Sequence, residues 1–397
     1  MKAIILQSKE FASHGPFSAP ASTSADSGSP ELELTVKEVS DVRLLRGTDP
    51  SRVVAPAMPV SLVKPVNSID AHTAPDQARE SETWGIRAVG AVNNQYSGDG
   101  ITVAVLDTGI ERNHAAFVGL DLKEMDFTGE GNGDTDGHGT HCAGIIFGRS
   151  RSELANGARF GVAPGVKRAL IGKILASGGG STDAVCRAIL WALDGGAQII
   201  SMSIAMDFPG YAKTLQEDLG YPPELAVSQA LAGYRANMRL FDRMFSLIRA
   251  RDSFGQGAIV LAAAGNESRR KENRDFVIDV APPAAADNIV SVAAFERSKT
   301  AGFPYGVAGF SNGGAVVAAP GVDVLSADRN GSLSLKSGTS MATPHAAGVA
   351  ALWAEKMQRE TGRFKADEVI KRFTGTASLS PGLAAEDVGV GIVQAPQ

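Results

Sequence analysis

Three short segments carry side chains that could act together on a carbonyl group. Asp107 follows an apolar run and precedes Thr-Gly, and His138 lies between two glycines in Asp-Gly-His-Gly-Thr-His. Ser340 lies in Ser-Gly-Thr-Ser-Met-Ala-Thr-Pro, at the start of an alanine-rich stretch. A histidine can remove the proton of a hydroxyl near neutral pH, which makes a serine nucleophilic. These residue types therefore predict nucleophilic catalysis by Ser340 with His138 as the general base.

Each segment also has a structural interpretation when it is taken alone. A serine at the start of a helix is a common N-cap, and an aspartate at the end of a strand needs no catalytic role. His138 and His141 have a spacing that would suit two metal ligands on one helix face. Because no glutamate lies between them and no third ligand is evident, the sequence argues against a metal site here.

The elements around these segments follow one pattern. From about Trp84, short apolar runs alternate with alanine-rich stretches, which is typical of βαβ units on a parallel sheet with both faces covered. The predicted strands are residues 101–106, 169–175, 198–204, 258–263 and 288–294, and the predicted helices are residues 182–193, 341–356 and 366–373. In such folds the site forms at the carboxyl ends of the strands, where Asp107 is placed.

Taken in the order Asp, His, Ser, the three segments resemble the signature blocks of the subtilisin family. The histidine block, His-Gly-Thr-His-Cys-Ala-Gly, looks nearest to the proteinase K branch. The resemblance covers residues 84–395 and implies a three-layer α/β fold with a mostly parallel central sheet. It also implies a serine endopeptidase in which Asp107 orients His138. A catalytically silent peptide-binding protein and an esterase with the same triad are the alternatives.

The resemblance assigns roles to two further stretches. Asn266, in Ala-Ala-Gly-Asn-Glu, would donate its side-chain amide to an oxyanion. The implied substrate-binding residues are Ser203, Ile204, Ala205, Ala264 and Gly265. The family usually has glycine where Ala205 stands, so its methyl group would narrow the first specificity pocket. Glu267, at the rim of that pocket, would favour a basic substrate residue or be a solvated surface glutamate.

Residues 1–83 are predicted to be an N-terminal extension of a peptidase domain that spans residues 84–397. Residues 11–30 have the composition of a flexible linker, and residues 31–66 contain short β-like runs broken by prolines. Because relatives are commonly made with an inhibitory N-terminal segment, we expect residues 31–80 to occupy the substrate cleft. Removal of the segment would fall near residues 75–90.

A long stretch between two predicted strands, residues 206–257, is expected to be a helical insertion. Apolar residues recur there at helical spacing, with a basic stripe of arginines beside them. The apolar positions are Leu231, Tyr234, Met238, Phe241, Phe245 and Ile248, and the basic positions are Arg235, Arg239 and Arg243. The basic stripe is either a solvated face or a docking surface.

Composition limits the remaining classes of function. The net charge is -5 with no long basic tract, so nucleic acid is not an expected partner. No run of about 18 apolar residues predicts a membrane span. The start of the chain has too short an apolar run for a secretory signal, so a cytoplasmic location is expected, with unconventional export as the alternative.

Metal and thiol chemistry have little support in the sequence. Cys142 and Cys186 fall in no metal-binding pattern and are expected to be buried thiols. Compact secreted relatives carry a calcium-ligating aspartate where this chain has Ala116, and calcium requires such oxygen ligands. We therefore expect no required cofactor, with calcium left as the weaker alternative. The expected partners are protein or peptide substrates.

Overall fold

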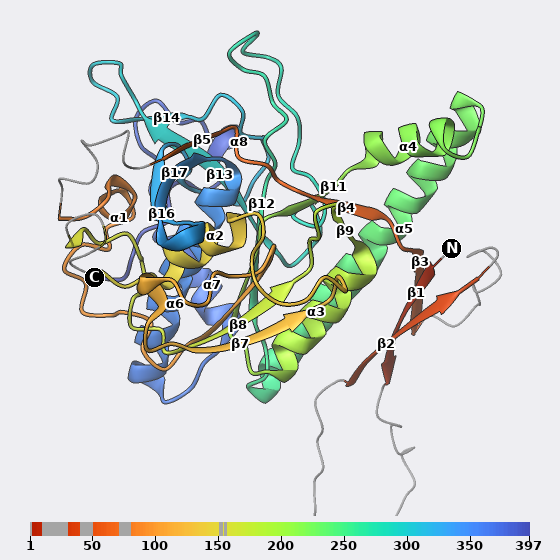
Figure 1. The fold of residues 1–397 in the computed structure, drawn as a ribbon. Coiled ribbons are helices and arrows are strands. Elements are labelled where there is room, and N and C mark those ends of the chain that lie inside the picture. Colours follow the sequence, from red (N-terminus) through yellow and green to blue (C-terminus); the bar gives the residue numbers. More distant parts are fainter. Residues whose placement is uncertain (1, 10–30, 40–50, 71–80, 151–153, 155–156) are drawn as a thin grey trace, which may run out of the picture.

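An eight-stranded sheet runs through the centre of the computed structural model, which describes residues 2–9, 31–39, 51–70, 81–150, 154 and 157–397 (Figure 1). The sheet has the order β14-β13-β12-β10-β6-β8-β7, with β15 also beside β13. Only β14 pairs antiparallel. The strands are β6 (Thr102–Asp107), β7 (Asp121–Asp126), β8 (Arg168–Lys173), β10 (Ile199–Met202), β12 (Ile259–Ala263), β13 (Val290–Arg297), β14 (Tyr305–Val307) and β15 (Val317–Pro320). The five predicted strands coincide with β6, β8, β10, β12 and β13, which confirms the mostly parallel α/β sheet.

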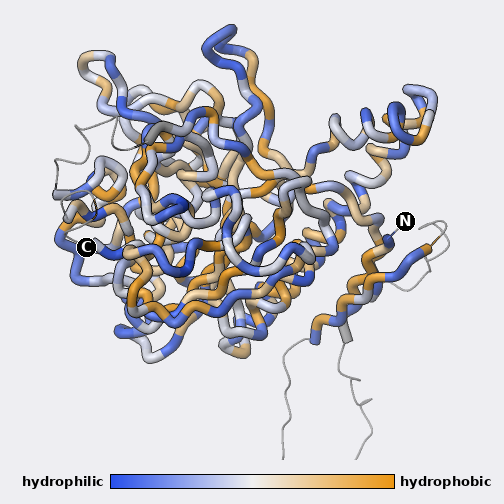
Figure 2. The backbone as a smooth tube through the Cα atoms, viewed as in Figure 1, coloured by the Kyte–Doolittle hydropathy of each residue, from blue (hydrophilic) through white to orange (hydrophobic). Residues whose placement is uncertain are grey.

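Helices cover both faces of this sheet because its strands are apolar on both sides. In β6, Val103 and Val105 lie in one core cluster with apolar side chains of residues 142–147 and 341–357, whereas Ala104 and Leu106 lie in another with those of residues 185–193 and 236–248. Hydrophobic residues accordingly concentrate in the interior (Figure 2). The helices are α1 (Trp84–Ala88), α2 (His138–Phe147), α3 (Thr182–Asp194), α4 (Phe208–Glu217), α5 (Pro223–Ala250), α6 (Thr339–Thr361), α7 (Ala366–Gly375) and α8 (Ala385–Val388), with short 3-10 turns at Ala115–Phe117, Arg251–Phe254 and Arg329–Gly331. In the described part of the chain, no helix is both long and apolar enough to cross a membrane.

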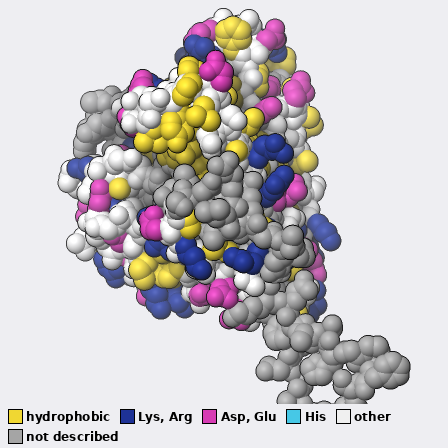
Figure 3. Space-filling view, turned by 90° about the vertical axis from the view of Figure 1, so that its right-hand side faces the viewer, with side chains coloured by type: hydrophobic (Ala, Val, Ile, Leu, Met, Phe, Trp, Pro, Cys, Tyr) yellow, Lys and Arg dark blue, Asp and Glu magenta, His cyan; other side chains and the backbone are white. Residues whose placement is uncertain are grey.

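The predicted helical insertion forms α4 and α5, which extend from the body of the molecule (Figure 1). The predicted apolar stripe is correct for Phe241, Phe245 and Ile248, which are buried. It is wrong for Leu231, which is exposed, because this end of α5 projects beyond the central sheet. Alanine and glycine form the buried face there. Hydrophobic side chains are visible on this side of the surface (Figure 3).

A three-stranded antiparallel sheet near the N-terminus packs against α5. Its order is β2-β1-β3, formed by β1 (Lys2–Lys9), β2 (Glu31–Glu38) and β3 (Arg52–Pro56). Ile4 and Leu6 of β1 are fully buried in the same cluster as Leu240 and Phe241 of α5. Asn237 Nδ2 donates a hydrogen bond to the Pro56 carbonyl at 2.8 Å. The insertion thus forms the platform on which the N-terminal sheet lies.

From this sheet the chain crosses the carboxyl edge of the central sheet as two further strands. β4 (Pro59–Leu62) lies between β11 (Ile204–Met206) and β9 (Gly180–Ser181). β5 (Asn67–Asp70) pairs with β17 (Leu333–Ser337), which forms a hairpin with β16 (Val324–Ala327). The β-like runs expected in residues 31–66 are therefore present. The linker predicted at residues 11–30 lies outside the described residues, as do residues 75–80 of the removal site predicted near residues 75–90.

Candidate active site

Three elements bring the predicted catalytic side chains to one point. Asp107 is the last residue of β6, His138 is the first residue of α2, and Ser340 is the second residue of α6. All three side chains are buried. Gly109 allows the chain after Asp107 to turn, because it has a φ of 111° and a Cβ there would lie 2.3 Å from the Gly133 carbonyl oxygen.

The aspartate and histidine form a buried pair. His138 Nδ1 and Asp107 Oδ1 are 2.8 Å apart, and the same oxygen accepts a hydrogen bond from the Thr108 N–H at 2.8 Å. Burial lowers the pKa of His138, but the charge of Asp107, its hydrogen bond and the neighbouring Cys142 together outweigh burial and hold that pKa well above its ordinary value. The pair can therefore orient the imidazole and stabilise its protonated form.

The serine hydroxyl points to a peptide carbonyl of the chain's own N-terminal extension. Ser340 Oγ donates to the Val63 carbonyl oxygen at 2.5 Å. Among the described residues His138 Nε2 has no hydrogen-bond partner, although it is buried. The Asp107–His138 pair is therefore formed, whereas the Ser340 hydroxyl is hydrogen-bonded to a peptide carbonyl and not to His138.

The helix that carries the serine has an altered hydrogen-bond pattern. Pro344 lies inside α6 and has no N–H, so the Ser340 carbonyl, four residues earlier, lacks its usual helical donor. That carbonyl instead accepts hydrogen bonds from Cys142 Sγ and from Ser203 Oγ, each at 3.3 Å. These contacts connect α6 to α2 and to the strand beside the cleft. Cys142 and Cys186 are both free and buried, as predicted.

Asn266 contacts Thr339, the residue before Ser340. Its Oδ1 accepts from the Thr339 N–H at 2.8 Å, which orients the amide, and its Nδ2 donates to the Lys64 carbonyl at 2.8 Å. A Cβ at Gly338 would lie 2.9 Å from Asn266 Nδ2. The φ of Gly338, 168°, is ordinary extended backbone. Space for Asn266 is the reason for glycine at this position.

The N-terminal segment lies in the cleft as an added strand. β4 pairs antiparallel with β11, with Ser61 opposite Ala205 and Leu62 opposite Ile204. The Val63 N–H donates to the Ser203 carbonyl at 3.2 Å, and the Val66 N–H donates to the Ser337 carbonyl at 2.7 Å. The predicted substrate-binding strand is thus the strand that holds an extended peptide.

The other two predicted substrate-binding residues form the opposite wall. The Ala264 carbonyl accepts from the Ala281 N–H at 3.0 Å, and the Gly265 N–H donates to Thr339 Oγ1 at 3.2 Å. Glu267, at the rim, accepts a hydrogen bond from Asn312 Nδ2 at 2.7 Å. Its carboxylate is therefore engaged with the protein.

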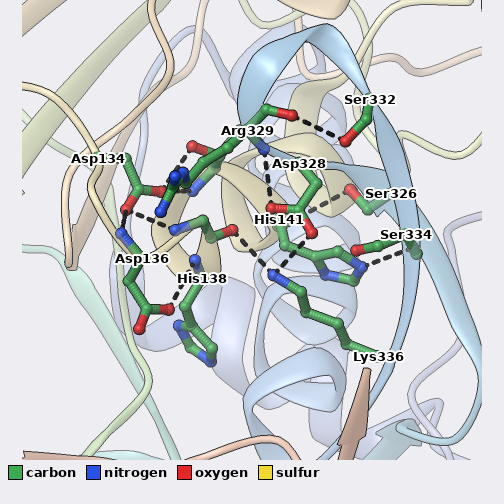
Figure 4. Close-up of polar contacts among 12 residues, drawn as sticks. Asp134, Asp136, His138, His141, Ser326, Asp328, Arg329, Ser332, Ser334 and Lys336 are labelled. Atoms are coloured by element: carbon green, nitrogen blue, oxygen red, sulfur yellow. Dashed lines mark hydrogen bonds and ion pairs between the residues drawn. The ribbon is translucent and has the colours of Figure 1, made fainter. Parts of the chain in front are cut away.

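Sequence reasoning missed Asp134, whose carboxylate organises the loop before His138 (Figure 4). It accepts hydrogen bonds from Thr108 Oγ1, from the N–H groups of Asp136, Gly137 and Thr140, and from Thr140 Oγ1, all between 2.6 and 3.0 Å. Burial raises the pKa of Asp134, but these hydrogen bonds outweigh burial and lower it. The carboxylate connects the residue after Asp107 to the first turn of α2. Nothing in the sequence distinguishes it from Asp136.

The β16–β17 hairpin holds the same loop from the other side (Figure 4). Nζ of the buried Lys336 lies 3.1 Å from Asp328 Oδ2 and donates to the Gly137 carbonyl at 3.2 Å. His141 Nε2 contacts the Ser334 carbonyl at 3.1 Å, and burial, with the charge of Lys336 adding to it, lowers the pKa of His141 well below its ordinary value. The rings of His138 and His141 thus contact different partners, Asp107 and the Ser334 carbonyl.

The side chains near the triad do not suit calcium. In the described part of the chain, the group of possible metal ligands is Asp107, His138 and Cys142. It offers one carboxylate, one imidazole and a thiol whose pKa is raised by burial, whereas calcium takes six to eight oxygen ligands. Ala116, the position compared above with a calcium ligand, has only a methyl side chain, and its N–H donates to His114 Nδ1 at 3.1 Å.

Comparison with known proteins agrees with this geometry. Residues 98–391 match the subtilase family. The chain is 30% identical to the thermophilic serine proteinase of Bacillus sp. (strain AK1) over 65% of its own length and 53% of the relative's. It is 33% identical to the intracellular serine protease of Paenibacillus polymyxa, over 66% of this chain and 69% of that protein. With subtilisin DY of Bacillus licheniformis it shares 31% identity, over 71% of this chain and 85% of that protein.

The chain belongs to the subtilase family, a family of serine peptidases, as the three sequence segments predicted. The match spans about half to two thirds of the length of some relatives, 53% of the thermophilic proteinase and 64% of subtilisin-like protease 6 of Trichophyton soudanense. The resemblance of the histidine block to the proteinase K branch stays a prediction.

Proposed function

We propose that this chain is a serine endopeptidase that cuts peptide bonds through an acyl-enzyme on Ser340. The observation that carries the proposal is the peptide already in the cleft, whose Val63 carbonyl lies 2.5 Å from Ser340 Oγ beside the buried Asp107–His138 pair. A backbone bound as an added strand is recognised largely by its main chain, which suits protein substrates.

In the proposed reaction, His138 removes the hydroxyl proton as Ser340 Oγ attacks the carbonyl carbon. Asn266 Nδ2 and the backbone N–H of Ser340, in the first turn of α6, stabilise the oxyanion. When the C–N bond breaks, the imidazolium of His138 gives its proton to the leaving amine. A water activated by His138 then hydrolyses the ester, and the proton returns to Ser340. Asp107 keeps the imidazole oriented throughout.

We further propose that β4 and the residues after it inhibit the enzyme in cis. Hydrogen bonding places Val63 where the residue before a scissile bond would lie, but Asn266 donates to the next carbonyl, that of Lys64. The hydroxyl of Ser340 donates to Val63 instead of His138, so the nucleophile is not activated. Pro65 has no N–H and a fixed φ, which restricts the rotation that would return the carbonyl to Asn266.

Casein digestion by the full chain, with Ser340→Ala as the control and a fluorophosphonate label on both, tests the proposed activity. We expect digestion and labelling by the wild type and neither by the variant. Labelling with ester hydrolysis but no casein digestion by any variant would favour the esterase alternative. No labelling of any active-site-intact variant would favour a catalytically silent peptide-binding protein.

Val63→Asp tests the inhibition, because a carboxylate in the apolar site of Val63 would expel the segment. We expect faster casein turnover than the wild type. Val66→Asp is the matched control, since the Val66 side chain is exposed and should leave turnover unchanged. Equal turnover by wild type and Val63→Asp would refute inhibition in cis without touching the proposed activity.

A further inference from the structure

The Val63 side chain shows what the first specificity pocket holds. It is 2% exposed and forms a small cluster with Ala205 and Ala263, against which Ala281 packs. The Val63 N–H is fixed by the Ser203 carbonyl at 3.2 Å, so the side chain is directed into the space between the two walls of the cleft. Every described side chain in this cluster is a methyl or isopropyl group.

Backbone hydrogen bonds close the pocket beyond these alanines. The Met206 N–H, on one wall, donates to the Pro282 carbonyl at 2.8 Å. The Ala281 N–H donates to the Ala264 carbonyl, on the other wall, at 3.0 Å. Residues 281 and 282 therefore join the two walls behind Val63. A longer side chain would have to separate strands that are held together by these hydrogen bonds.

The described side chains that pack around Val63 are all apolar and would leave a basic side chain without a partner. Glu267 is exposed at the rim, and one of its carboxylate oxygens accepts a hydrogen bond from Asn312 Nδ2 at 2.7 Å. A lysine or arginine in the pocket would bury its charge among alanines without a partner, which is costly.

We infer that the enzyme cuts after short aliphatic residues, valine and alanine above all, and that the Ala205 methyl group sets this limit. The inference rests on the proposed function. Val60, three residues upstream, is also 2% exposed and lies in an apolar cluster with Ile204 and Met206. Val-Ser-Leu, the sequence of residues 60–62, is therefore suitable as the part of a test substrate that precedes the cleaved residue.

The experiment uses quenched fluorescent peptides that contain Val-Ser-Leu-Xaa-Ser-Gly, with valine, alanine, phenylalanine or lysine as Xaa. They are incubated with the full chain, with Ala205→Gly and with Ser340→Ala. We expect kcat/KM for valine and alanine to exceed that for phenylalanine and lysine at least about tenfold. In Ala205→Gly the preference for valine over phenylalanine should fall about tenfold. Ala197→Gly removes a buried methyl group outside this cluster and should leave the preference unchanged.

Faster cleavage of the phenylalanine or lysine peptide by the wild type would overturn the inference and leave the proposed function intact. The same holds if Ala205→Gly does not change the preference. Cleavage that persists in Ser340→Ala would overturn the proposed function. If the full chain cleaves no peptide, Val63→Phe and Val63→Lys are compared with Val63→Ala on casein. We expect casein turnover by Val63→Phe and Val63→Lys, because the pocket would not accept the longer side chain and the segment would leave the cleft. Activity of Val63→Ala alone would overturn the inference.

Discussion

Replacement of Asp134 should damage both the stability of this protein and its proposed catalysis. Its carboxylate accepts five hydrogen bonds, four of them from fully buried donors of Thr108, Gly137 and Thr140. A buried donor left unpaired costs about 1 to 3 kcal/mol, and such losses within one network are not additive. We therefore expect Asp134→Ala to lower the free energy of unfolding by about 3 to 5 kcal/mol.

Asp134→Asn is the graded control for this change. An asparagine oxygen can keep the hydrogen bonds from Thr108 and Gly137, but its NH2 group faces the Thr140 N–H, and two donors cannot bond. We expect a loss of about 2 kcal/mol. The pKa of Asp134 is lowered from 3.8, so the charged form stabilises the fold fully above pH 3.8. This contribution is lost as pH falls toward the lower pKa of the folded state, so the difference between wild type and Asp134→Asn should shrink in acid.

Urea unfolding is best measured in a Ser340→Ala background, which prevents self-digestion. Peptide hydrolysis is measured in the active background. Because Asp134 connects the residue after Asp107 to the start of α2, Asp134→Ala should also lower kcat about 10- to 100-fold with little change in KM. A loss of stability below about 1 kcal/mol, together with a kcat within twofold of wild type, would refute the role assigned to this carboxylate.

Three further predictions concern residues in and beside the candidate active site. Asn266→Ala should lower kcat about 10²- to 10³-fold with nearly unchanged KM, and a dominant effect on KM would contradict its role as an oxyanion donor. Because Asp107 raises the pKa of His138, kcat/KM should still rise with pH well above 6.5. Asp107→Asn should move this rise in kcat/KM to lower pH and reduce kcat about 10⁴-fold. An unchanged pH profile would argue against the Asp107–His138 pair. Cys142→Ala should lower the free energy of unfolding by about 1 kcal/mol and Cys142→Ser by less, since only serine keeps a donor for the Ser340 carbonyl; equal urea midpoints would argue against that hydrogen bond.

Much of the fold could be predicted because its strands are buried on both faces. Residues 258–263 are apolar without interruption and residues 101–106 are apolar except for Thr102, and such runs between helical stretches leave few topologies besides a parallel sheet. The candidate catalytic residues could be picked out from the sequence because each lies in a segment where glycine permits close approach of the backbone. Gly109 and Gly338 both serve this purpose.

The features that escaped prediction depend on contacts between distant segments. β1 contains only a short apolar run, and its burial could not be predicted without knowing that it packs against α5. The side of α5 that is buried depends on what lies beside each turn, which is why Leu231 was placed wrongly. The ion pair of Lys336 with Asp328 could not be expected, because a lysine in a strand is usually solvated.

The sequence also could not predict that Val63 is the residue that lies at Ser340. An inhibitory segment was expected in residues 31–80, but any residue there could have lain at the serine. The register follows from the pairing of β4 with β11, which a short proline-containing run does not specify.

The path of the N-terminal segment has a consequence for the reverse reaction. On one side of Val63 the chain is anchored by the sheet on α5, and on the other side β5 is anchored to β17. A cut at this point would leave both new ends in place, at an effective concentration independent of dilution. The new amine would stay beside the acyl-enzyme and compete with water for it. The cut bond would then be re-formed repeatedly. The rate at which the segment leaves the cleft would therefore be set by dissociation of the sheet from α5 or of β5 from β17, and not by peptide-bond cleavage.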